Sequence, residues 1–237
     1  MQKIPLLFKT DEQRKYAIPE VNPVATWVFT EPTIAHRKYD GTAMRFDGEA
    51  WWSRRQVKNY SNGIRAIGFE MVEHDPITDK AFGWELVARS PFHAFWKEAR
   101  EYPPLDCDIF DDRNGEYETG TYELLGPKIN ANPENLSKHR LMPHNRAQQL
   151  GDIQALELDL VQDPALAYAE LKRVLFYLPV EGVVFKNRTQ TKFAKLRRKD
   201  FDFSKIELGV QLQESRERQR NWLSPLSTRQ NNDGSGI

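Results

Sequence analysis

Two Asp-Gly pairs in one short segment place the strongest constraint on how this chain can fold. Asp40-Gly41 and Asp47-Gly48 are each flanked by apolar or aromatic residues within residues 33–55. Both Asp and Gly tolerate positive φ, so an Asp-Gly pair between such runs is typical of a tight hairpin turn. The segment therefore predicts three antiparallel strands joined by two hairpins, with Lys38 at the end of the first strand.

Local signals elsewhere predict helices beside these strands. Residues 163–178 begin with Asp-Pro, which suits a helix start, and then place leucines on one helical face. Residues 90–99 combine Ser-Pro with an apolar, aromatic face, and Ser204 with Glu207 forms a capping-box pattern that opens a polar helix. Helices around a mainly antiparallel sheet predict the α+β fold class.

Composition narrows the class of protein further. Lys+Arg and Asp+Glu both number 34, so the net charge of the 237-residue chain is zero. This balance excludes a protein that coats nucleic acid with a uniformly basic surface. The single cysteine excludes an intrachain disulfide and a zinc site built from cysteines. No apolar run approaches the length of a signal peptide core or a membrane span, so we expect an intracellular, cytoplasmic protein.

Lys38 is the first candidate functional residue. A lysine acts as a nucleophile only when its amine is neutral, and nearby cations or burial favour that form. Three later segments offer charged partners. They are an apolar strand with a single carboxylate at Glu123, a β-branched strand bounded by Glu181 and Lys186, and the basic segment 192–199.

The basic segment predicts an anion site. Lys195 and Arg197 alternate with apolar residues, so a strand here would place both cations on one face. Two cations on one face suit a phosphate group. In the preceding segment, a regular strand would place Glu181 and Lys186 on opposite faces. Either Glu181 lies in the approach to that strand, or a bulge redirects one of the two side chains.

These segments, in this order, resemble motifs of the covalent nucleotidyltransferase superfamily, which includes DNA ligases, RNA ligases and mRNA-capping enzymes. Residues 38–41 (KYDG) resemble the nucleophile motif KxDG, and residues 121–126 (TYELLG) resemble the glutamate strand of motif III. Residues 181–186 (EGVVFK) resemble the EGxVxK motif IV, and residues 194–197 (AKLR) resemble the basic pair of motif V. Ser53-Arg54-Arg55 lies where the superfamily keeps the arginine of its Ser-Arg motif.

Within the superfamily, residues 120–134 and 139–144 are most similar to the small stand-alone RNA ligases of the RNA ligase 1 family. The resemblance implies a ligase adenylation fold of the α+β class, with mainly antiparallel sheets flanked by helices. We expect this nucleotidyltransferase domain over residues 1–203, a helical extension over 204–223 and a disordered tail over 224–237. The sequence after motif V is too short for an OB-fold barrel, so no OB domain is expected.

The resemblance implies an ATP-dependent RNA ligase that uses Mg²⁺ or Mn²⁺. Lys38 would attack the α-phosphate of ATP, expel pyrophosphate and form a lysyl-AMP intermediate. The AMP would pass to the 5′-phosphate of an RNA end, and a 3′-hydroxyl would then displace it. The implied partner is RNA with 5′-phosphate and 3′-hydroxyl ends. We expect the protein to act as a monomer, without a membrane partner.

The resemblance also gives a role to each motif residue. Asp40 would hold the nucleophile loop, Glu123 would bind the ribose hydroxyls, and Glu181 would be the metal ligand. The catalytic set is Lys38, Asp40, Glu181 and Lys195. The cations expected to contact the ribose or to neutralise the phosphates are Arg54, Arg55, Lys186, Lys195 and Arg197.

Two features depart from the pattern of these ligases. Many of them have Glu immediately before the nucleophile, where it helps to read adenine, and here that residue is Arg37. They also have an aromatic platform for the base after motif III, whereas residues 124–167 contain no Phe, Trp or Tyr. His139, His144 or an aliphatic side chain would take the place of that platform.

Two other functions remain open at this stage. A DNA ligase or a GTP-dependent capping guanylyltransferase would use the same lysine chemistry. A noncatalytic nucleic-acid-binding module with the same fold would bind without forming an adduct. A P-loop ATPase is not supported, because the chain contains no GxxxxGK[ST] motif.

Overall fold

A computed structural model describes residues 3–13, 15–61, 68–105, 117–152, 164–178 and 180–203. The predicted helical extension (204–223) and tail (224–237) lie outside these residues. The described residues form mostly antiparallel strands with few helices, which confirms the α+β class. None of their helices combines the length and the apolar character needed to cross a membrane. The described residues form two compact units: unit 1 holds those within Met1–Lys3 and Tyr39–Ala147, and unit 2 holds those within Ile4–Lys38 and Gln148–Ile237.

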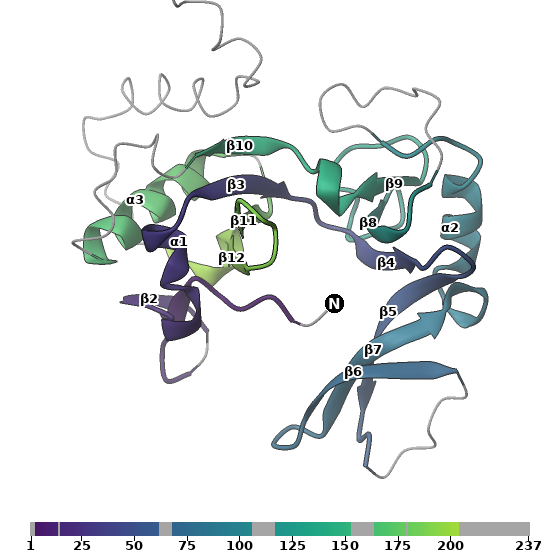
Figure 1. Ribbon diagram of the computed structural model, residues 1–237, viewed down its shortest axis with the longest axis horizontal. Helices are drawn as coiled ribbons and strands as arrows, with labels where there is room; N and C mark the ends of the chain where they lie inside the picture. Colours follow the sequence, from purple (N-terminus) through teal and green to yellow (C-terminus); the bar gives the residue numbers. More distant parts are fainter. Residues whose placement is uncertain are drawn as a thin grey trace, which may run out of the picture. The chain divides into compact units, whose positions relative to one another are not determined.

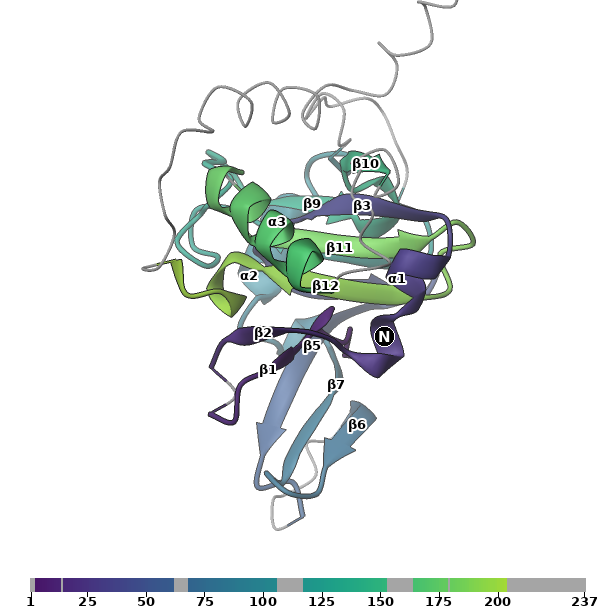
Figure 2. The same cartoon turned by 90° about the vertical axis from the view of Figure 1, so that its left-hand side faces the viewer.

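Unit 2 is built on a four-stranded antiparallel sheet with the strand order β10-β3-β11-β12, accompanied by a β1-β2 pair (Figures 1 and 2). Among its described residues, the α-helices are α1 (Trp27–Thr30) and α3 (Pro164–Tyr177). Its strands are β1 (Phe8–Thr10), β2 (Ala17–Val21), β3 (Thr33–Lys38), β10 (Gln149–Asp152), β11 (Gly182–Asn187) and β12 (Phe193–Arg197).

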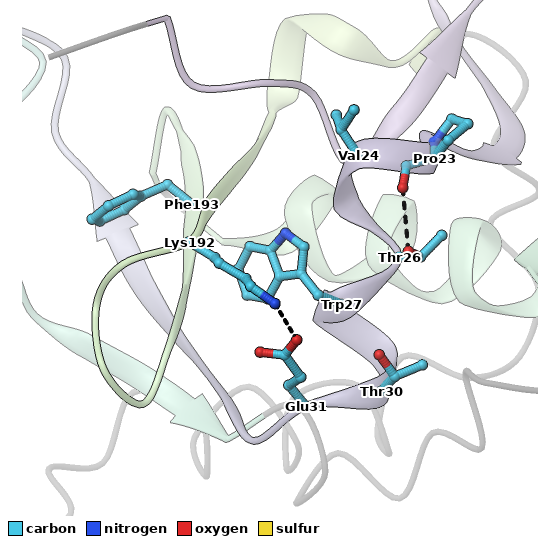
Figure 3. A pocket seen from close by; sticks show the side chains of 8 residues that line it. All are labelled: Pro23, Val24, Thr26, Trp27, Thr30, Glu31, Lys192 and Phe193. Carbon is cyan, nitrogen blue, oxygen red and sulfur yellow. Dashed lines mark hydrogen bonds and ion pairs between the residues drawn. The ribbon is translucent and has the colours of Figure 1, made fainter.

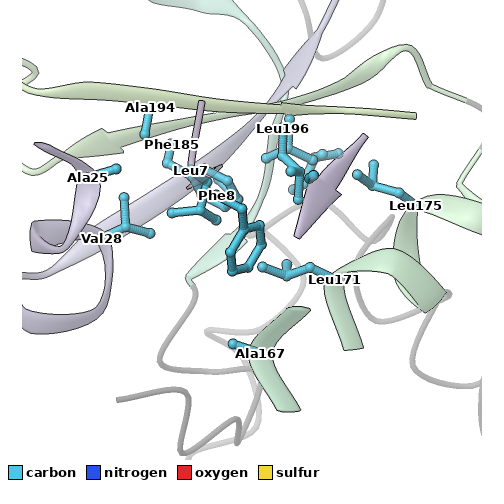
Figure 4. Close-up of a cluster of buried hydrophobic side chains, with 14 of the residues drawn as sticks. Leu7, Phe8, Ala25, Val28, Ala167, Leu171, Leu175, Phe185, Ala194 and Leu196 are labelled. Atoms are coloured by element: carbon cyan, nitrogen blue, oxygen red, sulfur yellow. The ribbon is translucent and has the colours of Figure 1, made fainter. Parts of the chain in front are cut away.

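The core of unit 2 lies against one face of this sheet. Alternate residues of β11 and β12 are buried there, among them Val183, Phe185 and Leu196, because successive strand residues point to opposite faces. Leu171 and Leu175 of α3 join the same cluster, so the predicted leucine face is confirmed. Figure 4 shows part of this cluster, with side chains from the sheet, from α1 and from α3.

Unit 1 contains a six-stranded antiparallel sheet with the strand order β6-β7-β5-β4-β8-β9. Helix α2 (His93–Ala99) starts three residues after the predicted Ser90. Its residues pack with Met44, Trp51 and Tyr122, which lie on one face of the sheet. The strands are β4 (Thr42–Phe46), β5 (Trp51–Lys58), β6 (Phe69–Asp75), β7 (Lys80–Leu86), β8 (Gly120–Leu125) and β9 (Arg140–Pro143).

The second predicted hairpin is confirmed. Strands β4 and β5 pair in antiparallel register, and the backbone N–H of Asp47 donates to the carbonyl of Ala50 at 3.2 Å. Gly48 has a φ of +102° in this turn, a conformation that glycine adopts without steric cost.

The first predicted hairpin is wrong. Strand β3 pairs with β10 and β11, whereas β4 pairs with β5 and β8, so the two strands around Asp40-Gly41 belong to different sheets. The glycine serves a close approach instead of a turn. A Cβ at Gly41 would lie 2.3 Å from the carbonyl oxygen of Leu124 on β8, so no larger residue fits.

Candidate functional site

The polar face of the unit 2 sheet gathers most of the predicted cations. Residues directly opposite each other in antiparallel strands point to the same face. Gly182 pairs with Lys38 and Arg197, Val184 pairs with His36 and Lys195, and Lys186 pairs with Ile34 and Phe193. This face is opposite the apolar core, so the predicted placement of Lys195 and Arg197 on one strand face is confirmed. The cationic side chains on it are Lys38, Lys186, Lys195 and Arg197.

Lys38 forms an ion pair with Glu181. Its Nζ donates to Glu181 Oε2, and the two side chains are only 24% and 15% exposed. Strand β11 begins at Gly182, so Glu181 lies in the approach to the strand, and no bulge is needed to bring it to the face of Lys38. The lysine is thus held by a carboxylate that directly precedes β11.

Lys186 lies at the other end of the same face. It is four residues beyond Gly182, which corresponds to about 13 Å along the strand. Only 5% of Lys186 is exposed, and this burial lowers its pKa from 10.5 to about 8 because the charged amine is deprived of water. Keeping the Lys186 amine charged at this position therefore costs folding free energy.

Lys195 lies between these two ends of the face, and two hydrogen bonds at the outer edge of β12 fix its backbone. Its N–H donates to the carbonyl of Pro5 at 2.9 Å, and its carbonyl accepts from Leu7 N–H at 2.9 Å. These bonds cover the outer edge of β12 and set the position of the lysine. Arg37, in contrast, pairs with Val183 and therefore lies on the opposite face from Lys38.

Arg197 is held by a partner that sequence reasoning missed. Its Nη2 donates to Asp200 Oδ1 at 2.6 Å, and its backbone N–H donates to Asp200 Oδ2 at 2.8 Å. Asp200 is buried, so much of the arginine charge is already offset within unit 2. The only sequence signal for this pair is the spacing of three residues.

In unit 1, Glu123 on β8 is fixed through both carboxylate oxygens. Gly41 N–H donates to Oε1 at 3.1 Å, and His144 Nε2 lies 2.8 Å from Oε2. The other ring nitrogen of His144 lies 2.9 Å from Thr121 Oγ1. Both ring nitrogens of His144 therefore contact side chains of β8. Sequence reasoning proposed His144 as a substitute for an aromatic platform but missed its contact with Glu123.

Asn130 fixes the Asp40-Gly41 segment from another direction. Its side-chain amide donates to Asp40 Oδ1 at 2.8 Å and to the carbonyl of Gly41 at 3.0 Å. Asn130 has a φ of +45°, and Ala131 and Asn132 follow it with positive φ as well. Asn tolerates this left-handed conformation better than most residues. A tight turn thus presents the amide to the residues that follow the candidate nucleophile.

The two arginines of the Ser-Arg segment point to opposite faces of β5. Arg54 lies over the rings of Trp84 and Phe82, with its guanidinium carbon 5.6 Å and 6.0 Å from their centroids. Burial lowers the pKa of Arg54. Arg55 instead donates to Glu85 at 2.5 Å. The strand register places Arg54 on the same face of the six-stranded sheet as Glu123, and Arg55 on the other face.

The described side chains around Lys38 do not form a complete metal site. They fit a metal ion that is bound together with a nucleotide. Among the described residues, no three His, Cys, Asp or Glu side chains cluster to form a metal site. Mg²⁺ is commonly bound by one or two carboxylates together with substrate phosphates and waters. Glu181 supplies one such carboxylate on a face that also carries cations for phosphates.

Unit 2 also has an open pocket beside α1, separate from the predicted site residues. Figure 3 shows the ion pair between Lys192 and Glu31 beside Trp27 in this pocket. The lining side chains are Pro23, Val24, Thr26, Trp27, Thr30, Glu31, Lys192 and Phe193. Because the charges of Lys192 and Glu31 offset each other, the pocket lacks the concentration of positive charge found on the polar sheet face.

Comparison with protein-family models finds no match to this chain, and a search of curated proteins finds none either. Function is therefore inferred from the motifs and from the contacts described above.

Proposed function

We propose that this protein is an ATP-dependent RNA ligase with a nucleotidyltransferase fold, and that it forms lysyl-AMP on Lys38. The observation that carries the proposal is the pairing of Lys38 with Glu181 on a sheet face that also holds Lys186 and Lys195. A nucleophilic amine, a carboxylate that can bind a divalent ion and cations for phosphate are groups that adenylyl transfer uses. The resemblance to the nucleotidyltransferase motifs assigns the same residues to this reaction, and this supports the proposal.

The first step begins with the amine of Lys38. Nζ releases a proton to solvent, and the lone pair of the neutral amine attacks the α-phosphorus of ATP. A nitrogen–phosphorus bond forms, the bond from the α-phosphorus to the bridging oxygen breaks, and pyrophosphate leaves with that oxygen. Lys195 and Lys186 offset the negative charge of the phosphates, because phosphoryl transfer depends mainly on positioning and charge stabilisation.

Two further steps would seal the RNA. An oxygen of the 5′-phosphate attacks the phosphorus of lysyl-AMP, which breaks the nitrogen–phosphorus bond and returns the amine to Lys38. The 3′-hydroxyl of the second RNA end then attacks the activated 5′-phosphate, and AMP leaves. The proposal gives the same lysine the roles of nucleophile and leaving group.

A divalent ion, Mg²⁺ or Mn²⁺, would have Glu181 as its protein ligand. Bound with the nucleotide phosphates, such an ion supplies charge neutralisation at the reacting phosphate. Glu181 would then give up its pairing with Lys38, which favours the neutral amine. The ribose contacts in the proposal come from Glu123 and from Arg54, because Arg55 lies on the opposite sheet face and is paired with Glu85.

The proposal is tested by incubation with α-labelled ATP and Mg²⁺. We expect covalent label on the wild-type protein and none on Lys38→Ala. Lys192→Ala is the matched control, because Lys192 also pairs with a carboxylate in unit 2 but lies outside the polar face. Absence of label on the wild-type protein would contradict the proposal.

Substrate comparisons separate the related functions. Label from GTP in preference to ATP would indicate a capping guanylyltransferase, and sealing of nicked DNA in preference to RNA would indicate a DNA ligase. A noncatalytic nucleic-acid-binding module predicts binding that weakens with salt, without any covalent label. The RNA ligase predicts label from ATP and joining of RNA ends that carry 5′-phosphate and 3′-hydroxyl groups.

A further inference from the structure

The carboxylate of Glu123 is held in one orientation by contacts with two other residues of unit 1. Gly41 N–H reaches Oε1 at 3.1 Å and His144 Nε2 reaches Oε2 at 2.8 Å, while only 12% of the Glu123 side chain is exposed. The final torsion of a glutamate is otherwise broad, and fixing the side chain costs conformational entropy. The two contacts therefore supply in advance an ordering that a ligand would otherwise have to impose.

Hydrogen-bond chemistry defines the state of the His144 ring. An ionised carboxylate only accepts hydrogen bonds, so Nε2 carries the proton that it donates to Glu123. In the neutral ring, Nδ1 is then an acceptor for the Thr121 hydroxyl at 2.9 Å. In the protonated ring, Nδ1 donates and the hydroxyl oxygen accepts. Both forms keep the bond to Glu123, because Nε2 carries a proton in each of them.

The remaining capacity of Glu123 suits a pair of hydroxyl groups. An ionised carboxylate offers about four lone-pair sites, and Gly41 and His144 use one on each oxygen. Each oxygen thus retains one acceptor site, and the two oxygens are held in a common, fixed plane. Two adjacent hydroxyl donors, as in a ribose, match this arrangement.

We propose that His144 is a positioning residue that aligns the Glu123 carboxylate for ribose hydroxyls and so sets the preference for ribonucleoside over deoxyribonucleoside triphosphate. The inference rests on the proposed function, because it assumes that Glu123 contacts the ribose of ATP. His144 acts through Glu123, and Thr121 acts through His144. His144 therefore acts through the ring nitrogens that bond to β8, and its ring face is not needed as a platform for the base.

The test measures adenylyl transfer to the protein with ATP, 2′-deoxy-ATP and 3′-deoxy-ATP. His144→Phe keeps an aromatic ring of similar size but loses both hydrogen bonds. We expect it to reduce the preference for ATP over at least one deoxy analogue about tenfold, the range for a hydrogen bond to a charged group. Transfer from that analogue should change little, because the hydroxyl that Glu123 would contact is already missing.

Three further variants make the test specific. His144→Gln retains an amide donor and a carbonyl acceptor, so it should restore most of the ATP preference. Thr121→Val removes only the outer hydroxyl and should give a smaller loss of the same kind. It also covers the case in which His144→Phe fails to fold. His93→Phe, at an exposed position of α2, should behave like the wild-type protein.

Each outcome decides the question. A reduced preference in His144→Phe that is restored in His144→Gln supports the inference. An unchanged preference for ATP over both analogues, or an equal loss with all three nucleotides, overturns it while the ligase proposal stands. If the wild-type protein forms no adduct with any nucleotide, the proposed function fails and the inference fails with it.

Discussion

Replacement of the buried Lys186 by methionine is expected to stabilise the protein at neutral pH. Lys186 is 5% exposed, and burial brings the pKa of its amine from 10.5 to about 8. One pKa unit corresponds to about 1.4 kcal/mol, so holding this charge in the folded state costs about 3 kcal/mol at pH 7. Methionine has a similar volume and carries no charge, so Lys186→Met should recover part of that cost.

The sign of the pH dependence follows from the same pKa difference. Between about pH 8 and pH 10.5 the unfolded chain binds more protons at Lys186 than the folded protein does. The amine of Lys186 therefore makes the wild-type free energy of unfolding rise with pH across this window. Lys186→Met lacks this rise. The advantage of the variant is greatest below pH 8 and disappears towards pH 10.5.

Urea denaturation at pH 7 and pH 9.5 measures this difference in the free energy of unfolding. Lys192→Met at an exposed position is the control and should show no comparable gain. A Lys186→Met variant that is less stable than wild type at pH 7 would refute the reasoning, and so would a difference that does not shrink at high pH. Under the proposed function, the stabilised variant should also lose adenylyl transfer, since a costly buried cation is retained for phosphate binding.

Three further predictions concern unit 1. Gly41→Ala places a methyl group 2.3 Å from a carbonyl oxygen of β8. In urea denaturation, it should lower the free energy of unfolding by about 3 kcal/mol. A variant as stable as wild type would show that β8 can move aside. Asn130→Asp puts a second carboxylate beside Asp40 and should cost about 1 kcal/mol by the same assay, with less effect in high salt. The hydrogen bond from His139 lowers the pKa of Glu98, so this carboxylate stabilises the fold above its unfolded pKa. Glu98→Gln should therefore lose stability near pH 6 and match wild type at low pH, and a pH-independent difference would contradict that cause.

Local patterns predicted the elements whose signals are contained in their own sequence. The leucine spacing of α3 and the Asp47-Gly48 turn depend on a few neighbouring residues, and both were confirmed. The Asp40-Gly41 signal failed because strand pairing depends on distant segments. Strand β3 finds its partners at residues 149–152 and 182–187, and no turn pattern encodes that choice.

The candidate site shows the same division. Period-two alternation was sufficient to place Lys195 and Arg197 on one strand face. It could not distinguish Arg54 from Arg55, because that choice depends on which face of the sheet carries Glu123. The bond from His144 to Glu123 joins residues 21 apart in the sequence, so it follows from tertiary placement and has no local signal.

The central claim is that Lys38 becomes covalently joined to AMP, and peptide mapping by mass spectrometry tests it most directly. The protein is incubated with ATP and Mg²⁺, digested, and searched for AMP on every lysine-containing peptide. The account predicts AMP on Lys38 alone, removed when excess pyrophosphate reverses the reaction. AMP on another lysine, or an unmodified Lys38 under these conditions, would contradict it.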